Sequence, residues 1–329
     1  MSKQDTLILK GIALLMMIMV HIGVTSSSLF IHIGDYSLWS FIGGGCHPVA
    51  FFLMLSGYGL RHVYENGDKH HYTRLLKLFV HYWAIMLLFV TIGYFKIGAD
   101  VYPGNWMKMI ENITSYHTSY NYECWFVFPF IFLSALYPII FKILDRLGGV
   151  FILISCLIYF ICGYIISHYQ LIYKTAPYTI YNSIQVFFML FSFVIGAWLK
   201  KENICEKLVG WANKHKHHKL ILLGIIIFIL IVNIPIKTSA FGPFFALALF
   251  ISIWLIIRGK TIRPLQLIGK HSMNIWMIHT YFLYYLFHNE IYQLQYSILI
   301  YLTTLCLSLL SSYIINFLTS KIDQKLIHT

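Results

Sequence analysis

Residues 148–168 read GGVFILISCLIYFICGYIISH and contain no Asp, Glu, Lys or Arg. A helix of about 20 apolar residues is long enough to cross the hydrocarbon core of a bilayer. Nine further apolar segments of similar length lie on either side of this stretch. The sequence therefore predicts an all-α, polytopic membrane protein with about ten transmembrane helices. The ten segments are residues 7–25, 41–61, 75–97, 123–141, 148–168, 182–199, 219–235, 240–257, 272–288 and 296–318.

The composition of the 329-residue chain favours the same fold class. It is 59% hydrophobic and only 11% charged, whereas soluble domains are about 45–50% apolar and about 25% charged. Mean hydropathy is +0.71. No polar stretch exceeds roughly 25 residues, which is too short for an independently folding soluble unit. Residues 1–329 are therefore predicted to form a single transmembrane domain.

The formal net charge of +12 comes from basic residues grouped between the apolar segments. Ten spans would place 20 of the 24 Lys and Arg residues on one side of the membrane. The other side would keep only Lys96, Lys108, Lys174 and Lys237. Basic residues favour the cytoplasmic side, so both termini are predicted to be cytoplasmic. This pattern indicates the lipid bilayer as a partner and gives no reason to expect nucleic acid.

Ionisable residues within the apolar segments are candidates for function, because charge is costly at membrane depth. Lys10 and His21 lie eleven residues apart in the first segment, about three helical turns and about 16 Å along one face. Arg74, Lys77 and His81 share a face of the third segment. Snorkelling lysines, ordinary flanking charge and histidines bonded to a backbone carbonyl are the structural alternatives.

Four more residues complete the candidate set. His279 is expected near mid-depth in the ninth segment, and Ser56 lies in a Gly-rich second segment where close helix packing is the simpler role. Glu123 and Trp125 open the fourth segment at the outer surface. Glu123 is the carboxylate at that surface that could orient an imidazole such as His21, and Trp125 also fits an interfacial aromatic belt.

The remaining histidines and cysteines give no metal signature. His70-His71 and the run from Lys214 to His218 lack accompanying acidic or Cys ligands, so solvated charge facing lipid headgroups is the preferred interpretation. The six cysteines show no CxxC spacing and are interpreted as free thiols. A disulfide between Cys46 and Cys124 is left open, because both are expected near the outer face.

Several segments, in order along the chain, resemble the motifs of the acyltransferase-3 family of ten-span membrane acyltransferases. They are Lys10 to His21, with the family's basic-x10-His spacing; Phe51–Tyr58, similar to FFxxSGF; Arg74–Trp83, similar to RxxRxxPxYW; Cys124–Phe126 with Tyr137-Pro138, similar to WfL…P; and Ile268–His279, similar to lGkySlxiYllH. Lys77 stands where the family has a second arginine, and Val80 where proline is common. Lysine keeps the charge but loses bidentate phosphate geometry.

The resemblance implies transfer of an acetyl or other short acyl group from cytoplasmic acyl-CoA to a hydroxyl of a cell-surface glycan. Many members of the family O-acetylate bacterial surface polysaccharides, so the bacterial cytoplasmic membrane is the expected location. Acetyl-CoA would be a co-substrate, with no tightly bound cofactor and no metal. The acceptor would be a surface polysaccharide or a lipid-linked glycan.

The expected site combines residues of several segments. Its members are His21 and Glu123 as catalytic residues, Lys10, Arg74 and Lys77 as donor-binding residues, and Ser56, Trp125 and His279 along the channel for the acceptor. Two alternatives stay open at this point. A glycan flippase or exporter would need a polar channel but no acyl-CoA, and a bis-histidine haem protein could use two of His21, His81 and His279.

Overall fold

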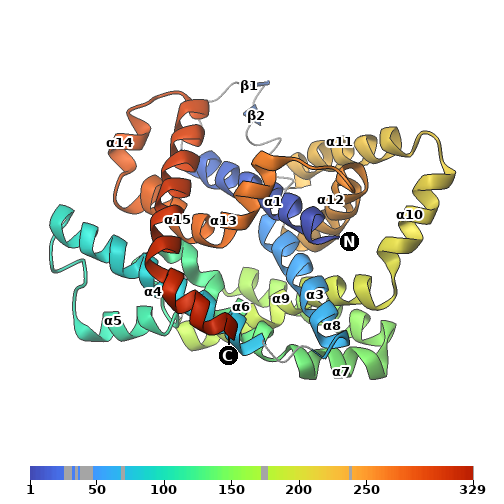
Figure 1. Ribbon diagram of the computed structural model, residues 1–329, viewed down its shortest axis with the longest axis horizontal. Coiled ribbons are helices and arrows are strands. Elements are labelled where there is room, and N and C mark those ends of the chain that lie inside the picture. Colours follow the sequence, from blue (N-terminus) through green and yellow to red (C-terminus); the bar gives the residue numbers. More distant parts are fainter. Residues whose placement is uncertain are drawn as a thin grey trace. The chain divides into compact units, whose positions relative to one another are not determined.

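The computed structural model describes residues 1–25, 32–33, 36–37, 47–67, 71–171, 177–236 and 239–328. The elements in these ranges are helical apart from one short antiparallel pair, β1 (His32–Ile33) and β2 (Tyr36–Ser37). The predicted all-α class is thus confirmed (Figure 1). The helices are α1 (Lys3–Thr25), α3 (Pro48–Glu65), α4 (His71–Lys96), α5 (Trp106–Ile113), η2 (Tyr122–Phe126), α6 (Val127–Ala135), α7 (Tyr137–Leu147), α8 (Gly149–His168), α9 (Tyr178–Lys201), α10 (Ile204–Lys214), α11 (His218–Ile236), η3 (Ser239–Phe241), α12 (Gly242–Ile257), α13 (Arg263–Thr280), the π-helical η4 (Tyr281–Tyr285), α14 (His288–Tyr292) and α15 (Ser297–His328).

Five helices within the described ranges are long and apolar enough to cross a membrane by length and composition. They are Lys3–Ile22, Tyr72–Lys96, Gly149–His168, Tyr178–Lys201 and Ser297–Leu326. The number rises to seven if each of two bent helix pairs forms one span. A multi-pass membrane protein is therefore supported, whereas ten spans is more than these helices alone account for. Part of the difference arises at α12, which is apolar but only 16 residues long.

Two predicted segments are placed differently in the structure. The segment expected at residues 272–288 begins nine residues earlier, as α13, because Pro264 in its first turn suits a helix start. The last segment, expected to end at residue 318, continues as helix to His328. The chain region 123–141 is interrupted between Ala135 and Tyr137, at the junction of α6 and α7.

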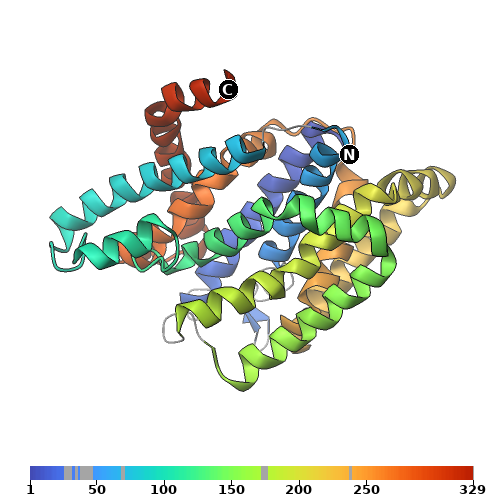
Figure 2. The same ribbon diagram turned by 90° about the horizontal axis from the view of Figure 1, so that it is seen from below.

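The residues form two compact units, each built from three separate stretches of the chain. Unit 1 comprises residues 1–67, 136–164 and 187–272, and unit 2 comprises residues 68–135, 165–186 and 273–329. In unit 1, α1 packs on α3 and α12, and α11 lies beside α12 (Figure 1). In unit 2, α15 packs against α4. Helix α4 is uninterrupted, and Figure 2 shows it from the side.

Glycines allow the helices of unit 1 to approach closely, as expected for small residues in membrane helices. A Cβ added to Gly57 of α3 would lie 2.0 Å from the backbone oxygen of Phe193. A Cβ on Gly196 of α9 would lie 2.0 Å from the backbone oxygen of Met54. The two contacts are reciprocal, so α3 and α9 meet backbone to backbone. The packing role predicted for glycine in the second segment is confirmed at Gly57.

Candidate functional site

The first motif lies on a single helix of unit 1. Lys10 and His21 both belong to α1, which runs without interruption from Lys3 to Thr25. Both side chains are half-buried. Eleven residues at 1.5 Å per residue separate them by about 16 Å along the axis, so the predicted spacing on one helix is confirmed. Ser56 of α3 is half-buried and adjoins Gly57, in the close contact with α9.

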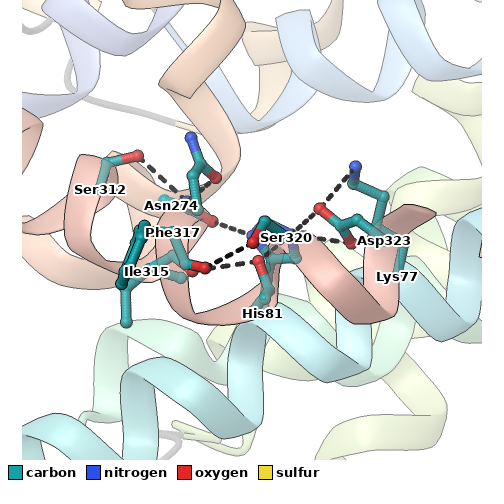
Figure 3. Close-up of polar contacts among 10 residues, drawn as sticks. Lys77, His81, Asn274, Ser312, Ile315, Phe317, Ser320 and Asp323 are labelled. Atoms are coloured by element: carbon teal, nitrogen blue, oxygen red, sulfur yellow. Dashed lines mark hydrogen bonds and ion pairs between the residues drawn. The ribbon is translucent and has the colours of Figure 1, made fainter. Parts of the chain in front are cut away.

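In unit 2, a polar cluster joins α4 to the end of α15 (Figure 3). The Lys77 Nζ lies 2.9 Å from the Asp323 Oδ2. The His81 Nε2 lies 3.0 Å from the same Oδ2 and 3.3 Å from Oδ1. The His81 side chain is only 3% exposed and that of Asp323 15%, against 41% for Lys77. The carboxylate is therefore shared by one buried imidazole and one lysine that reaches the surface.

The opposite edge of the His81 ring meets α13. Its Nδ1 lies 2.8 Å from the Asn274 Oδ1. The Asn274 amide nitrogen donates to the Ser312 Oγ and the Asn316 Oδ1, each at 3.0 Å. Those two bonds orient the amide so that its oxygen faces the imidazole.

Both ring nitrogens of His81 consequently face oxygen acceptors. The third neighbour, the Thr319 Oγ1 at 3.2 Å from Nε2, donates its own hydrogen to the Ile315 backbone oxygen. The arrangement therefore places the buried His81 ring between the Asn274 amide and the Asp323 carboxylate, which also contacts Lys77 (Figure 3).

Asp323 and Asn274 were missed by the sequence reasoning. Asp323 lies five residues beyond residue 318, the predicted end of the last segment. A signal was present, because polar residues recur every three or four positions along α15. They are Ser308, Ser312, Asn316, Thr319 and Asp323. This spacing is typical of one helix face, and Ser308, Ser312 and Thr319 are at most 2% exposed.

A second polar group of unit 2 connects η2 with the end of α13. The Asn121 Nδ2 donates to the Met277 backbone oxygen at 3.0 Å, and its Oδ1 accepts from the Thr280 Oγ1 at 2.9 Å. The same Oδ1 accepts from the Glu123 backbone nitrogen at 3.2 Å. Asn121 thus holds the turn that carries Glu123 against Thr280, the residue after His279. The sequence motifs did not predict a role for Asn121.

The three remaining predicted site residues take different environments. His279 is fully buried, with its Nδ1 3.0 Å from the Ile275 backbone oxygen. Trp125 is half-buried and meets Tyr181 edge-on, with ring centroids 6.3 Å apart. Arg74 is exposed in the first turn of α4.

The structure thus groups Arg74, Lys77, Glu123, Trp125 and His279 in unit 2 and keeps Lys10, His21 and Ser56 in unit 1. Within unit 2 it brings Lys77 to Asp323, and Glu123 to the turn that Asn121 ties to α13. Pairing of His21 with Glu123, and of Lys10 with Arg74 and Lys77, stays a prediction.

The structure also bears on the alternatives for cysteine and histidine. Cys124 is a free, buried thiol whose Sγ lies 3.8 Å from the Met277 backbone oxygen; Cys46 lies outside the described residues. Both ring nitrogens of His81 have partners, which disfavours it as a haem ligand. Among the described residues, no three His, Cys, Asp or Glu side chains are grouped to hold a metal ion.

Comparison with known sequences supports the resemblance noted from the motifs. No curated protein and no solved structure gives a significant match to the chain. One sequence family does match, over residues 8–317, and it is described as an acyltransferase domain. The match covers nearly the whole chain, including both α1 motif residues, the α4 motif and the α13 motif. The chain therefore belongs to the acyltransferase-3 family, as a multi-pass membrane protein.

Proposed function

We propose that the protein transfers an acetyl or other short acyl group from cytoplasmic acyl-CoA to a hydroxyl of a cell-surface glycan. The observation that carries the proposal is the family match over residues 8–317, with Lys10 and His21 three turns apart on one uninterrupted helix. The enzyme would reside in a bacterial cytoplasmic membrane, with about ten spans and both termini cytoplasmic. Acetyl-CoA, the glycan acceptor and the lipid bilayer are its proposed partners.

His21 is the proposed catalytic base. Its imidazole would take the proton of the acceptor hydroxyl as that oxygen attacks the thioester carbonyl. The C–S bond then breaks, and the CoA thiolate leaves and is protonated. In a two-step variant the imidazole accepts the acyl group first and passes it to the hydroxyl. Glu123 would hold the imidazole tautomer, in the manner of a triad's third member.

The donor would meet the cations Lys10, Arg74 and Lys77, because phosphates favour charge-assisted hydrogen bonds. The Asp323 carboxylate lies 2.9 Å from the Lys77 Nζ. Asp323 would therefore fix the position of one of these three cations. Ser56, Trp125 and His279 are the proposed lining of the path to the acceptor. An indole such as that of Trp125 offers a flat apolar face combined with one donor.

The test is transfer of labelled acetyl from acetyl-CoA into alkali-labile ester on surface glycan, in membranes with and without the protein. His21→Ala is assayed in parallel at matched membrane abundance. Label that requires the protein and disappears with His21→Ala supports both the reaction and the site. Absence of label with acetyl, succinyl and other short donors, with acceptor supplied, would favour glycan export instead. Label that survives His21→Ala would leave the reaction and reject the base.

A further inference from the structure

A cavity of about 490 Å³ lies in unit 1, beside the first turn of α1. Its other walls are the junction of α10 and α11 and the turn that follows α12. Ligand pockets of small molecules commonly have volumes of about 300–1,000 Å³. This cavity is therefore large enough for part of a nucleotide.

The buried carboxylate of Asp5 forms part of the cavity wall. Asp5 is 5% exposed, and its Oδ2 accepts from the Ser2 backbone nitrogen at 3.0 Å, while its own nitrogen donates to the Ser2 Oγ at 3.0 Å. This reciprocal pair is a capping box at the start of α1. The Asp5 oxygens also accept from the Gly259 nitrogen at 3.2 Å and the Trp254 Nε1 at 3.4 Å.

Asp5 thereby ties the start of α1 to the turn after α12. Gly259 has a φ of 69°, a left-handed conformation that glycine adopts without steric cost. The turn places Arg258 and Lys260 on either side of this anchored glycine, both lining the cavity. The backbone between these two cations is thus held by a hydrogen bond to a buried carboxylate, which ordinary flanking charge does not require.

The cavity carries an excess of positive charge. Lys219 adds a third cationic side chain to the lining, with half-buried His218 beside it. Within the part of the chain that the structure describes, Arg258, Lys260 and Lys219 have no carboxylate within ion-pair distance. The Arg258 Nη2 instead donates to the neutral Asn213 Oδ1 at 2.6 Å. Asp5 is the one carboxylate in the described lining, and it already accepts three N–H donors.

We propose that this cavity binds the nucleotide end of acyl-CoA, with Arg258, Lys260 and Lys219 contacting its 3′-phosphate. The proposal rests on the proposed function and names the site of its donor. Guanidinium and ammonium groups are the side chains that recognise phosphate. The positive-inside assignment places all three cations on the cytoplasmic side, where acyl-CoA is found.

The geometry of α1 accommodates the rest of the donor. At 1.5 Å per residue, Lys10 lies about 8 Å further along the helix than Asp5, and His21 about 24 Å further. The nucleotide would occupy the cavity at the first turn, and the diphosphate would meet Lys10. The extended pantetheine arm would carry the thioester along α1 towards His21.

The experiment compares two donors that differ by one phosphate. KM is measured for acetyl-CoA and for acetyl-dephospho-CoA, which lacks the 3′-phosphate, with the full-length protein in nanodiscs. In the variant carrying Arg258→Gln and Lys260→Gln we expect KM for acetyl-CoA to rise about tenfold, as loss of a charge-assisted contact predicts. KM for acetyl-dephospho-CoA should change less than about twofold, because that donor makes no 3′-phosphate contact.

The matched control carries Lys142→Gln and Arg146→Gln. These exposed basic residues of α7 belong to unit 1 and do not line the cavity. The control removes the same charge and should leave both KM values unchanged. An equal rise in KM for the two donors, or an equal effect of the control, would overturn the proposal.

Direct binding separates this proposal from the reaction itself. Calorimetric binding of 3′,5′-ADP to the wild type and its loss in the cavity variant would support the site even if no acyl transfer is found. The titration is repeated with zwitterionic nanodiscs and with nanodiscs containing anionic lipid. If the substitutions weaken only anionic-lipid binding and leave 3′,5′-ADP binding intact, the cavity holds a lipid headgroup and the proposal is wrong.

Discussion

Removal of the Asp323 carboxylate is the most informative single perturbation of unit 2. Within the described chain, Asp323 is the one carboxylate in contact with Lys77 and His81. Lys77 reaches solvent, but the His81 ring is almost completely buried and bonded on both edges. In Asp323→Ala, the His81 ring would keep its contact with the Asn274 oxygen but lose its hydrogen bond to the carboxylate. We therefore expect destabilisation to arise mainly from His81.

The magnitude follows from the different exposures of the two partners. A hydrogen bond to a charged group contributes about 1.5–3 kcal/mol to stability. The Lys77 ion pair is partly exposed and should contribute less than about 1 kcal/mol. Asp323→Ala should therefore lower the free energy of unfolding by about 2–4 kcal/mol. Asp323→Asn retains an acceptor oxygen and should cost about half as much.

A double-mutant cycle measures these contributions separately. The unfolding free energies of Asp323→Asn, His81→Gln and the combined variant are obtained by SDS titration in mixed micelles, followed by circular dichroism. The coupling energy should be about 1.5–3 kcal/mol. The parallel cycle with Lys77→Gln should give less than about 1 kcal/mol. Lys321→Gln, at an exposed position of the same helix turn, is the control and should have little effect.

Two results would refute this reasoning. A coupling energy near zero between Asp323 and His81 would mean that their buried contact stabilises the folded state no more than contacts of the two groups with water would. A larger coupling with Lys77 than with His81 would mean that burial does not determine the strength of this cluster.

Three further predictions concern catalysis and packing. His21→Ala should abolish acyl transfer at unchanged membrane abundance, and residual activity above a tenth of wild type would reject His21 as the base. Lys77→Gln should raise the donor KM several-fold with kcat nearly unchanged, since a binding contact is lost; a fall in kcat alone would contradict a donor-binding role. Gly57→Ala should lower the free energy of unfolding by about 1–3 kcal/mol, because the added Cβ would clash with the backbone of α9. Gly59→Ala, on the same helix but with open space around it, is the control and should be neutral. Equal effects of the two substitutions would show that the close approach of α3 and α9 is unimportant.

The sequence predicted features that depend on local spacing. The shared helix of Lys10 and His21 and the packing role of Gly57 both follow from helical periodicity, and the structure confirms both. Membership of the acyltransferase-3 family was also readable, because several short motifs occurred in the family's order. Such features require only residue identity and distance along the chain.

The number of spans was harder to predict, because hydropathy counts apolar residues without locating breaks in the backbone. Apolar sequence continues through residues 123–141, yet α6 ends at Ala135 and α7 begins at Tyr137. Helix α13 shows the opposite effect. It begins at Arg263, nine residues before the predicted start of the segment at residue 272.

Contacts between residues far apart in the chain were the other feature that the sequence did not predict. Asp5 and Asp323 illustrate why. Both lie close to the ends of their helices, where a carboxylate is ordinarily a solvated or capping residue. Neither is flagged by a search for charge deep in apolar segments. Their partners are distant in sequence: Asp5 bonds Gly259, and Asp323 bonds His81.

The two carboxylates have a common physical consequence. In a chain with 12 acidic and 24 basic residues, each acidic side chain buried near a basic cluster determines which cations are neutralised. Asp323 forms an ion pair with Lys77 and also contacts His81, so the charge of Lys77 beside the α4 motif is offset by a carboxylate. Asp5 is instead satisfied by backbone and indole N–H groups, so the cations around its cavity keep all of theirs. If anionic donors bind where positive charge is both fixed in place and uncompensated, the Asp5 cavity should bind phosphate more strongly than the Asp323 cluster. Comparing 3′,5′-ADP affinity between the Arg258→Gln/Lys260→Gln variant and Lys77→Gln tests this order, and a larger loss with Lys77→Gln would reverse it.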